Sequence, residues 1–199
     1  GDDISWWEND GTPNNDNWTE YLVDGDFDGA NVVYATDMDG DGDVDIVGAA
    51  FTADDISWWE NDGTPNNSSW TEYLIDGDFN GAYSVYATDM DGDGDVDVLG
   101  AAADADDISW WENDGTPNNA SWTEHLVDGD FDGSFSVYAT DMDGDGDADI
   151  VGAASAGDDI SWWENTSIIP SLPTITTEYS ADGSFDGARS VYATDIDGD

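Results

Sequence analysis

Residues 37–50 read DMDGDGDVDIVGAA, in which Asp occupies every second position from 37 to 45 before the chain becomes apolar. Five carboxylates within nine residues repel one another at neutral pH unless something offsets their charge. The stretch recurs from Asp89 and from Asp141, and a fourth copy begins at Asp195. The crowding is therefore a repeated feature of the chain that needs a physical explanation.

The recurrence extends over the whole sequence. The phrase DDISWWEN occurs four times, 52 residues apart, and the Asp-rich stretches keep this interval until the last step, which is 54. A fixed period of this length is typical of repeat architectures. Neither end resembles a natural terminus, so we expect a longer array. We divide the chain into repeat 1 (1–52), repeat 2 (53–104), repeat 3 (105–156) and an incomplete repeat 4 (157–199) with a proline-containing insertion.

The composition is strongly acidic. The chain has 49 Asp and Glu residues against one Arg and no Lys, for a formal net charge of -48. Proteins that bind nucleic acid or anionic membrane surfaces do so with cationic side chains, which this chain almost lacks. We therefore expect no nucleic-acid partner and no membrane insertion in this stretch. Hydrophobic residues make up 38% of the chain, which is enough for a packed core. With no cysteine to form disulfides, divalent cations are the first candidate to offset the repulsion, and a surface screened by high salt is a compatible alternative.

Each repeat contains runs that predict strands. The runs are rich in β-branched and aromatic residues, lack the 3.6-residue spacing of a helix, and are bounded by Gly, Asp, Asn and Pro. In the first repeat they cover residues 3–8, 18–23, 32–36 and 45–50. We expect an all-β fold of tandem four-stranded antiparallel repeats, shaped like β-propeller blades, in a closed propeller or an open linear stack. Small residues such as Gly48 and Ala49 suit close approach of neighbouring sheets.

The Asp-rich loop has the spacing of a calcium site. Counted from Asp37, carboxylates fall at positions 1, 3, 5 and 9, and Gly42 at position 6 permits a tight turn. Calcium takes six to eight oxygen ligands in irregular geometry, whereas magnesium needs a stricter octahedron. Position 7 would offer its backbone carbonyl and leave its side chain in solvent. The predicted metal residues are Asp37, Asp39, Asp41, Asp43 and Asp45; Asp89, Asp91, Asp93, Asp95 and Asp97; Asp141, Asp143, Asp145, Asp147 and Asp149; and Asp195, Asp197 and Asp199.

The loop differs from an EF-hand in two respects. Position 12, where an EF-hand has Glu, is Gly48, and the flanks predict strands rather than helices. The pattern D-x-D-x-D-G-x-x-D between two strands resembles the calcium loop of FG-GAP and VCBS-type repeats. That resemblance implies four-stranded blades of an integrin-α-like β-propeller, calcium in the hairpin and an extracellular or cell-surface setting. The FG-GAP phrase itself is present only loosely, as residues 27–30 and their copies.

Two other repeated features allow alternative interpretations. The phrase DGDFDG at 24–29 also alternates carboxylates, but it lacks a closing Asp, so we favour a tight turn over a second metal site. Adjacent tryptophans, such as Trp6 and Trp7, point to opposite faces of a strand. Stacked sheets would bury both rings, whereas an unstacked face would expose a row of Trp for sugars or a partner surface.

The sequence favours a structural role over catalysis. His125 stands where the other repeats have Tyr, and no nucleophile–base set can be assembled around it. We expect an extracellular calcium-binding structural or adhesive protein that is not an enzyme, with neighbouring repeats or identical chains as partners in a surface filament. The alternative is a ligand-binding propeller module for a carbohydrate or a surface protein, which would show copy-specific residues converging on one face.

Overall fold

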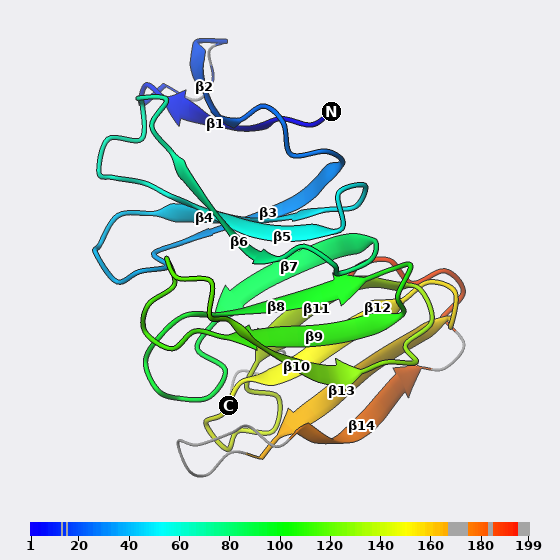
Figure 1. The fold of residues 1–199 in the computed structure, drawn as a ribbon. Helices are drawn as coiled ribbons and strands as arrows, with labels where there is room; N and C mark the ends of the chain where they lie inside the picture. The colour runs from blue at the N-terminus through cyan, green and yellow to red at the C-terminus, as the bar shows by residue number, and fades with distance from the viewer. Residues whose placement is uncertain (13, 15, 167–174, 183–184, 195–199) are drawn as a thin grey trace.

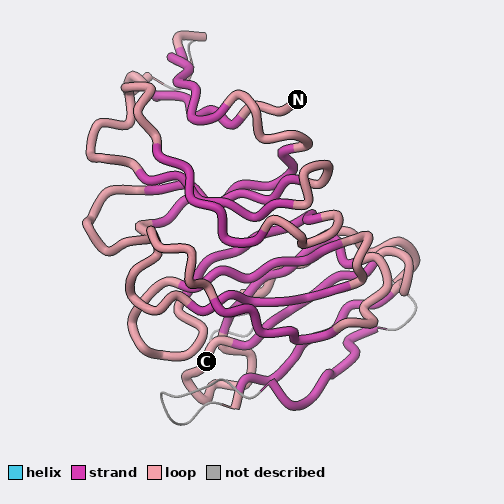
Figure 2. The backbone as a smooth tube through the Cα atoms, in the orientation of Figure 1, coloured by secondary structure: helices cyan, strands magenta, loops and turns pink. Residues whose placement is uncertain are grey.

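The computed structural model describes residues 1–199 apart from 13, 15, 167–174, 183–184 and 195–199. Within the described residues the secondary structure consists of β-strands joined by turns and loops, without helices (Figure 2). The all-β prediction is therefore confirmed for this part of the chain. The two prolines of the insertion, Pro170 and Pro173, lie outside the described residues.

The strands form one two-stranded sheet and three four-stranded sheets, and each sheet is an antiparallel meander. The two-stranded sheet contains β1 (Ile4–Asn9) and β2 (Trp18–Asp24). The first four-stranded sheet contains β3 (Ala30–Thr36), β4 (Asp45–Ala50), β5 (Asp55–Glu60) and β6 (Thr71–Asp76). The second contains β7 (Ala82–Thr88), β8 (Asp97–Ala102), β9 (Asp107–Glu112) and β10 (Thr123–Asp128). The third contains β11 (Ser134–Thr140), β12 (Asp149–Ala154), β13 (Asp159–Asn165) and β14 (Ile175–Asp182).

The sheets begin half a repeat later than we predicted. The four runs expected to form one sheet divide between two, because β1 and β2 pair with each other while β3 and β4 start the next sheet. The physical reason lies in the connection between β2 and β3. Phe27 in this connection is buried and packs edge-on against Trp59 of the next sheet, with ring centroids 4.8 Å apart. The division of the sequence at residues 52, 104 and 156 stays a prediction.

The sheets follow one another in chain order as an open stack (Figure 1). The first strands of the four-stranded sheets lie together, because β7 contacts both β3 and β11. None of the sheets in the described part of the chain closes on itself. The observed arrangement is thus an open stack of blade-like sheets.

The second strand of each four-stranded sheet lies at the centre of the core. Every residue of β4, β8 and β12 is buried. Gly100 in β8 lies at a close approach between sheets: a Cβ atom there would lie 2.8 Å from Ile56 Cδ1 of the preceding sheet and 2.8 Å from Trp111 Cζ3 of its own sheet. The small residues of the sequence therefore allow this approach, as predicted.

The paired tryptophans connect each sheet to both of its neighbours. Trp58 donates its indole N–H to the carbonyl of Pro117 in the following sheet, at 3.1 Å. Trp59 donates to Asp24 Oδ2 at the end of β2 in the preceding sheet, at 3.0 Å. Both rings are at most 1% exposed. Stacking therefore buries both faces of the strand, which confirms the first interpretation of the Trp pairs for the inner sheets.

At the two-stranded sheet the same residue type is exposed. Trp7 of β1 is 53% exposed, whereas its counterpart Trp59 is covered by Phe27 and lies over Gly48 of the adjacent strand. The sheet of β1 and β2 has no strand in the position of β4, so nothing equivalent to Gly48 lies beneath Trp7. Burial of the second Trp thus depends on a complete four-stranded sheet.

We predict that Gly100→Ala destabilises the protein by about 1–3 kcal/mol, because the added methyl group would overpack the contact with Ile56 and Trp111. Urea unfolding followed by Trp fluorescence would measure the change. Gly25→Ala is the matched control, since its Cβ would lie 3.5 Å from Leu22 Cδ2 and 3.6 Å from Asp3 Oδ1, ordinary contact distances. Equal stability of the two variants would show that the sheets do not approach as closely as described.

Candidate metal centre

Each Asp-rich loop joins the first two strands of a four-stranded sheet. In the second sheet, Thr88 at the end of β7 pairs with Asp97 at the start of β8. The pairing of the two strands therefore closes the loop at position 9. The first sheet pairs Thr36 with Asp45 and the third pairs Thr140 with Asp149 in the same register. The loop therefore forms the tip of a β-hairpin, as the flanking sequence predicted.

The loops bring carboxylate oxygens within 4.8 Å of one another in three groups of three residues. Positions 1 and 3 belong to every group. The third member is position 5 in the first loop and position 9 in the second and third loops. The groups are Asp37, Asp39 and Asp41; Asp89, Asp91 and Asp97; and Asp141, Asp143 and Asp149.

The other predicted residues fall into three classes. At position 7, the side chains of Asp43, Asp95 and Asp147 are not part of these groups. Asp45, Asp93 and Asp145 lie in their loops at positions 9, 5 and 5, but the side chains are not part of these groups. The predicted residues of the fourth loop lie outside the described part of the chain: Asp195, Asp197 and Asp199. The structure thus gathers three of the four predicted side chains in each described loop.

Backbone amides orient the first carboxylates of the loop. Asp89 accepts hydrogen bonds from the N–H groups of Gly92 at 2.7 Å and Gly94 at 3.0 Å. Asp91 accepts one from Asp93 N–H at 3.0 Å. Gly92 and Gly94 have φ of 78° and 100°, which a residue with a side chain rarely adopts. Position 4 therefore requires glycine as well as position 6. The sequence prediction included position 6 alone, although the DGDG motif contains both glycines.

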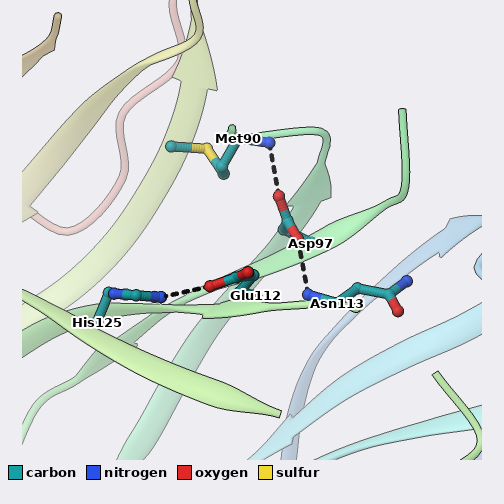
Figure 3. Close-up of polar contacts among 5 residues, drawn as sticks. All are labelled: Met90, Asp97, Glu112, Asn113 and His125. Atoms are coloured by element: carbon teal, nitrogen blue, oxygen red, sulfur yellow. Dashed lines mark hydrogen bonds and ion pairs between the residues drawn. The ribbon is translucent and has the colours of Figure 1, made fainter. Parts of the chain in front are cut away.

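Position 9 is a buried carboxylate with two backbone donors. Asp97 is 1% exposed and accepts hydrogen bonds from Met90 N–H and Asn113 N–H, each at 2.8 Å (Figure 3). Asp45 and Asp149 make the equivalent pairs of contacts. Met90 belongs to the loop and Asn113 follows β9, so one side chain joins the hairpin tip to the third strand of the sheet.

The asparagine at the end of DISWWEN is a site residue that sequence reasoning missed. Asn113 is 3% exposed, and its side chain donates to the carbonyl of Val96 at 3.1 Å, in addition to the backbone contact with Asp97. Asn61 and Asn165 repeat this contact with Val44 and Ala148. The available signal was the recurrence of this Asn in every copy of the phrase.

Burial makes the charge at position 9 unfavourable in the absence of a cation. The pKa of Asp97 is raised to about 7, mainly by burial; the two amide hydrogen bonds lower it and the charges of Asp91 and Asp93 add to the increase. Burial likewise raises the pKa of Asp45 to about 6 and raises the pKa of Asp149. A positive charge among these carboxylates would remove this penalty.

The side chain at position 7 does not lie in solvent as predicted. Asp43 is half-buried, and a Cβ atom on Gly63 would lie 2.9 Å from its Oδ2. Asp95 takes the same position over Gly115. The missing side chain of the glycine lets the carboxylate rest on the NDGT turn that follows the third strand.

The DGDFDG turns have a structural use. Asp24 accepts hydrogen bonds from Asp26 N–H at 2.7 Å and from the Trp59 indole at 3.0 Å, so both of its oxygens are engaged. No group of three carboxylates within 4.8 Å forms at these turns among the described residues. The contacts favour the tight-turn interpretation over a second metal site.

The donor set of the loops fits a hard divalent cation. Every side-chain donor is a carboxylate, and such oxygens suit calcium or magnesium rather than soft metals. His125 lies elsewhere: it stacks on Trp110 with centroids 4.3 Å apart and contacts Glu112 Oε2 at 3.0 Å (Figure 3). Tyr73 makes the same contacts with Trp58 and Glu60 in the preceding sheet. His125 is therefore a substituted strand residue, as predicted.

We predict that the metal-free protein loses stability as the pH rises from about 4 to about 7. The folded-state pKa of Asp97 lies above the value of about 3.9 expected in the unfolded chain, so the folded chain binds more protons across this interval. The contribution of this group is fully present below about pH 4 and is lost as the pH rises through about 7, at no more than about 1.4 kcal/mol per pH unit. Urea unfolding in the presence of a chelator at several pH values would measure it.

Asp97→Asn should flatten this pH dependence, whereas Asp26→Asn, at an exposed turn, should leave it unchanged. An identical slope in all three proteins would contradict a role for Asp97 in the pH dependence.

Comparison with known proteins agrees with the loop geometry. The model of the FG-GAP-like repeat family matches residues 37–100 and 89–152, two overlapping stretches that each begin at position 1 of one Asp-rich loop and end shortly after the next. Together they span more than half of the chain. No curated protein matched the sequence. Among the described residues, no helix has the length and hydropathy of a membrane span. The chain belongs to the FG-GAP-like repeat family.

Proposed function

We propose that this chain binds calcium in its Asp-rich loops and that the bound ions stabilise a tandem array of sheets with a structural or adhesive role outside the cell. The main support for calcium binding is that, in each of the three described loops, oxygens of three carboxylates lie within 4.8 Å of one another. Two of the three groups include a buried aspartate whose pKa is raised by burial. Carboxylates crowded in this way are what calcium binding would require.

The residues that would hold the ion follow from the loop. The side chains at positions 1, 3, 5 and 9 offer carboxylate oxygens, and position 7 offers its backbone carbonyl. Calcium accepts this number of oxygen ligands and tolerates irregular geometry, which favours it over magnesium. When bound, the ion would supply positive charge that offsets the repulsion among the aspartates.

Calcium bound at position 9 would act on more than the loop. Asp97 accepts hydrogen bonds from Met90 in the loop and from Asn113 after β9. In the neighbouring sheet, Asn165 donates its side-chain amide to Met90 O at 2.9 Å. Because these contacts connect the hairpin tip to two sheets, binding energy at the loop would become folding energy of the stack.

The repeated interface supports a structural role. Trp59 and Trp111 make equivalent contacts in successive sheets, with Asp24 and Asp76, and neither contact depends on a unique constellation of reactive groups. FG-GAP-like repeats are typical of extracellular proteins, where millimolar calcium would occupy even weak sites. We therefore propose an extracellular setting, no enzymatic activity, and association with further repeats or with identical chains in a surface filament.

A ligand-binding module is the second candidate, and one observation favours it. The residues that differ most between copies meet on one side of the stack. Tyr83 packs against Phe135 with centroids 4.3 Å apart and lies 6.1 Å from Phe51, while Arg189 stands over Phe135 at 5.5 Å. Such a row could contact a carbohydrate or a surface protein. Loss of binding to a glycan or protein array after Tyr83→Ala would support this candidate.

We predict that calcium raises the thermal unfolding temperature of the chain. At a free calcium concentration 100 times the dissociation constant, each site would add about 2.7 kcal/mol to the free energy of unfolding. Far-UV circular dichroism with increasing calcium chloride would follow the shift, and a chelator should reverse it. Sodium chloride at equal ionic strength separates binding from charge screening. An equal shift with sodium chloride would favour the salt-screened surface instead.

Asp91→Asn tests the loop itself. Asn at this position keeps an oxygen that can accept from Asp93 N–H but removes the negative charge. Isothermal titration calorimetry should show one site fewer than in the parent chain. Asp78→Asn is the matched control, because Asp78 occupies the same position in a DGDFDG-type turn and is exposed. Loss of a site in the control variant, with none lost in Asp91→Asn, would place calcium at the other turn.

The filament proposal has its own test. Electron microscopy of the chain in calcium should show threads if copies associate end to end. Separate globules at all concentrations would contradict the filament and leave calcium binding unaffected.

A further inference from the structure

A row of tyrosine side chains runs across the stack. Tyr34 lies in β3, Tyr86 in β7, Tyr138 in β11, and Tyr192 at the equivalent sequence position of the fourth repeat. Successive ring centroids are 4.7, 4.7 and 4.8 Å apart, and the rings are tilted by 54°, 49° and 51°. We call these four residues the tyrosine ladder. Each contact joins rings from successive copies of the repeat.

The other tyrosines have different neighbours. Tyr21, Tyr73 and Tyr179 stack on tryptophans, and Tyr83 packs against Phe135. Within the ladder one ring is far more exposed than the others. Tyr34, Tyr86 and Tyr138 are half-buried, whereas Tyr192 is 71% exposed. A dissolved oxidant therefore reaches the ladder most easily at Tyr192.

The hydroxyl groups of neighbouring ladder rings lie close enough to interact. Burial and the hydroxyls of Tyr34 and Tyr138 raise the pKa of Tyr86. A hydrogen bond with Tyr138 raises the pKa of Tyr192. A neutral phenol that loses an electron also releases its proton, which a neighbouring hydroxyl or water can accept. Two such radicals held at these ring distances are positioned to combine before they diffuse apart.

We propose that the tyrosine ladder is an oxidative cross-linking site, at which neighbouring rings couple to dityrosine in the presence of a peroxidase and hydrogen peroxide. Each of two phenols loses one electron and one proton, and a carbon–carbon bond forms between ring carbons ortho to the hydroxyls. One hydrogen peroxide takes up the two electrons and two protons and becomes two water molecules. The pair Tyr138–Tyr192 reacts first because it contains the exposed ring.

The cross-link would strengthen the stack without a cation. Tyr138 and Tyr192 come from successive repeats, so the bond closes a long loop of chain. Covalent closure of a long loop restricts the unfolded chain, as a disulfide does, and the chain has no cysteine to supply one. The coupling needs the folded stack, but no residue of the Asp-rich loops takes part in it, so failure to cross-link and failure to bind calcium are separate outcomes.

The test uses the full chain, a haem peroxidase and limiting hydrogen peroxide. Dityrosine fluorescence should appear, the mass of the monomer should fall by two hydrogen atoms per cross-link, and fragmentation after Glu-specific proteolysis should join Tyr138 to Tyr192. Tyr192→Phe keeps the ring but cannot couple, so this cross-link should disappear. Tyr179→Phe is the matched control, since Tyr179 is 42% exposed and stacks on Trp162, and it should leave the cross-link intact.

The urea-unfolded chain provides the reference for random coupling, in which Tyr138–Tyr192 should have no preference. Circular dichroism before oxidation establishes that both variants keep the fold. Cross-links that join Tyr21, Tyr73 or Tyr179 as often as ladder residues, that form only between chains, or that match the unfolded reference would overturn the proposal.

Discussion

The buried aspartate that closes each Asp-rich loop is the constraint on which the sheets depend. Asp97 holds two backbone N–H groups from segments on either side of its strand, and a neutral side chain of the same shape could not accept from both as well. The same burial that strengthens these hydrogen bonds opposes the charge. The structure therefore has a carboxylate that it needs for hydrogen bonding and that it cannot easily keep ionised without a nearby cation.

Much of the fold could be predicted because its signals are local. The strand runs, the hairpin tip and the opposite orientation of Trp58 and Trp59 follow from residue types at short spacing. The grouping of strands into sheets could not be predicted in the same way. It depends on Phe27 packing against Trp59 in the next sheet, a contact between residues far apart in the sequence. The 52-residue period is compatible with two ways of grouping four consecutive strands into a sheet, and tertiary packing determines which of the two forms.

The site shows the same division between local and distant information. The spacing of the loop predicted that positions 1, 3, 5 and 9 come together, and positions 1 and 3 meet in every described loop with either position 5 or position 9. The role of Asn113 was missed because its partner Asp97 is 16 residues away and is contacted through the backbone N–H, so the recurrence of the Asn was the one signal in the sequence. The prediction that the position 7 side chain lies in solvent was wrong for Asp95 because Gly115, which makes room for this side chain, belongs to another turn.

Because the sheets begin half a repeat later than the sequence copies, a cation at one loop would affect strands from two copies. Each four-stranded sheet takes its first hairpin from one copy of the sequence and its second hairpin from the next, so the Asp-rich loop and the Trp pair that follows it share a sheet. Asp97 joins the two hairpins through Asn113, and Trp111 of the second hairpin reaches Asp76 of the preceding sheet at 3.1 Å. A change at the loop therefore acts on the interface between sheets through two side-chain contacts. For this reason a cation at the hairpin tip would stabilise the whole stack rather than a single turn.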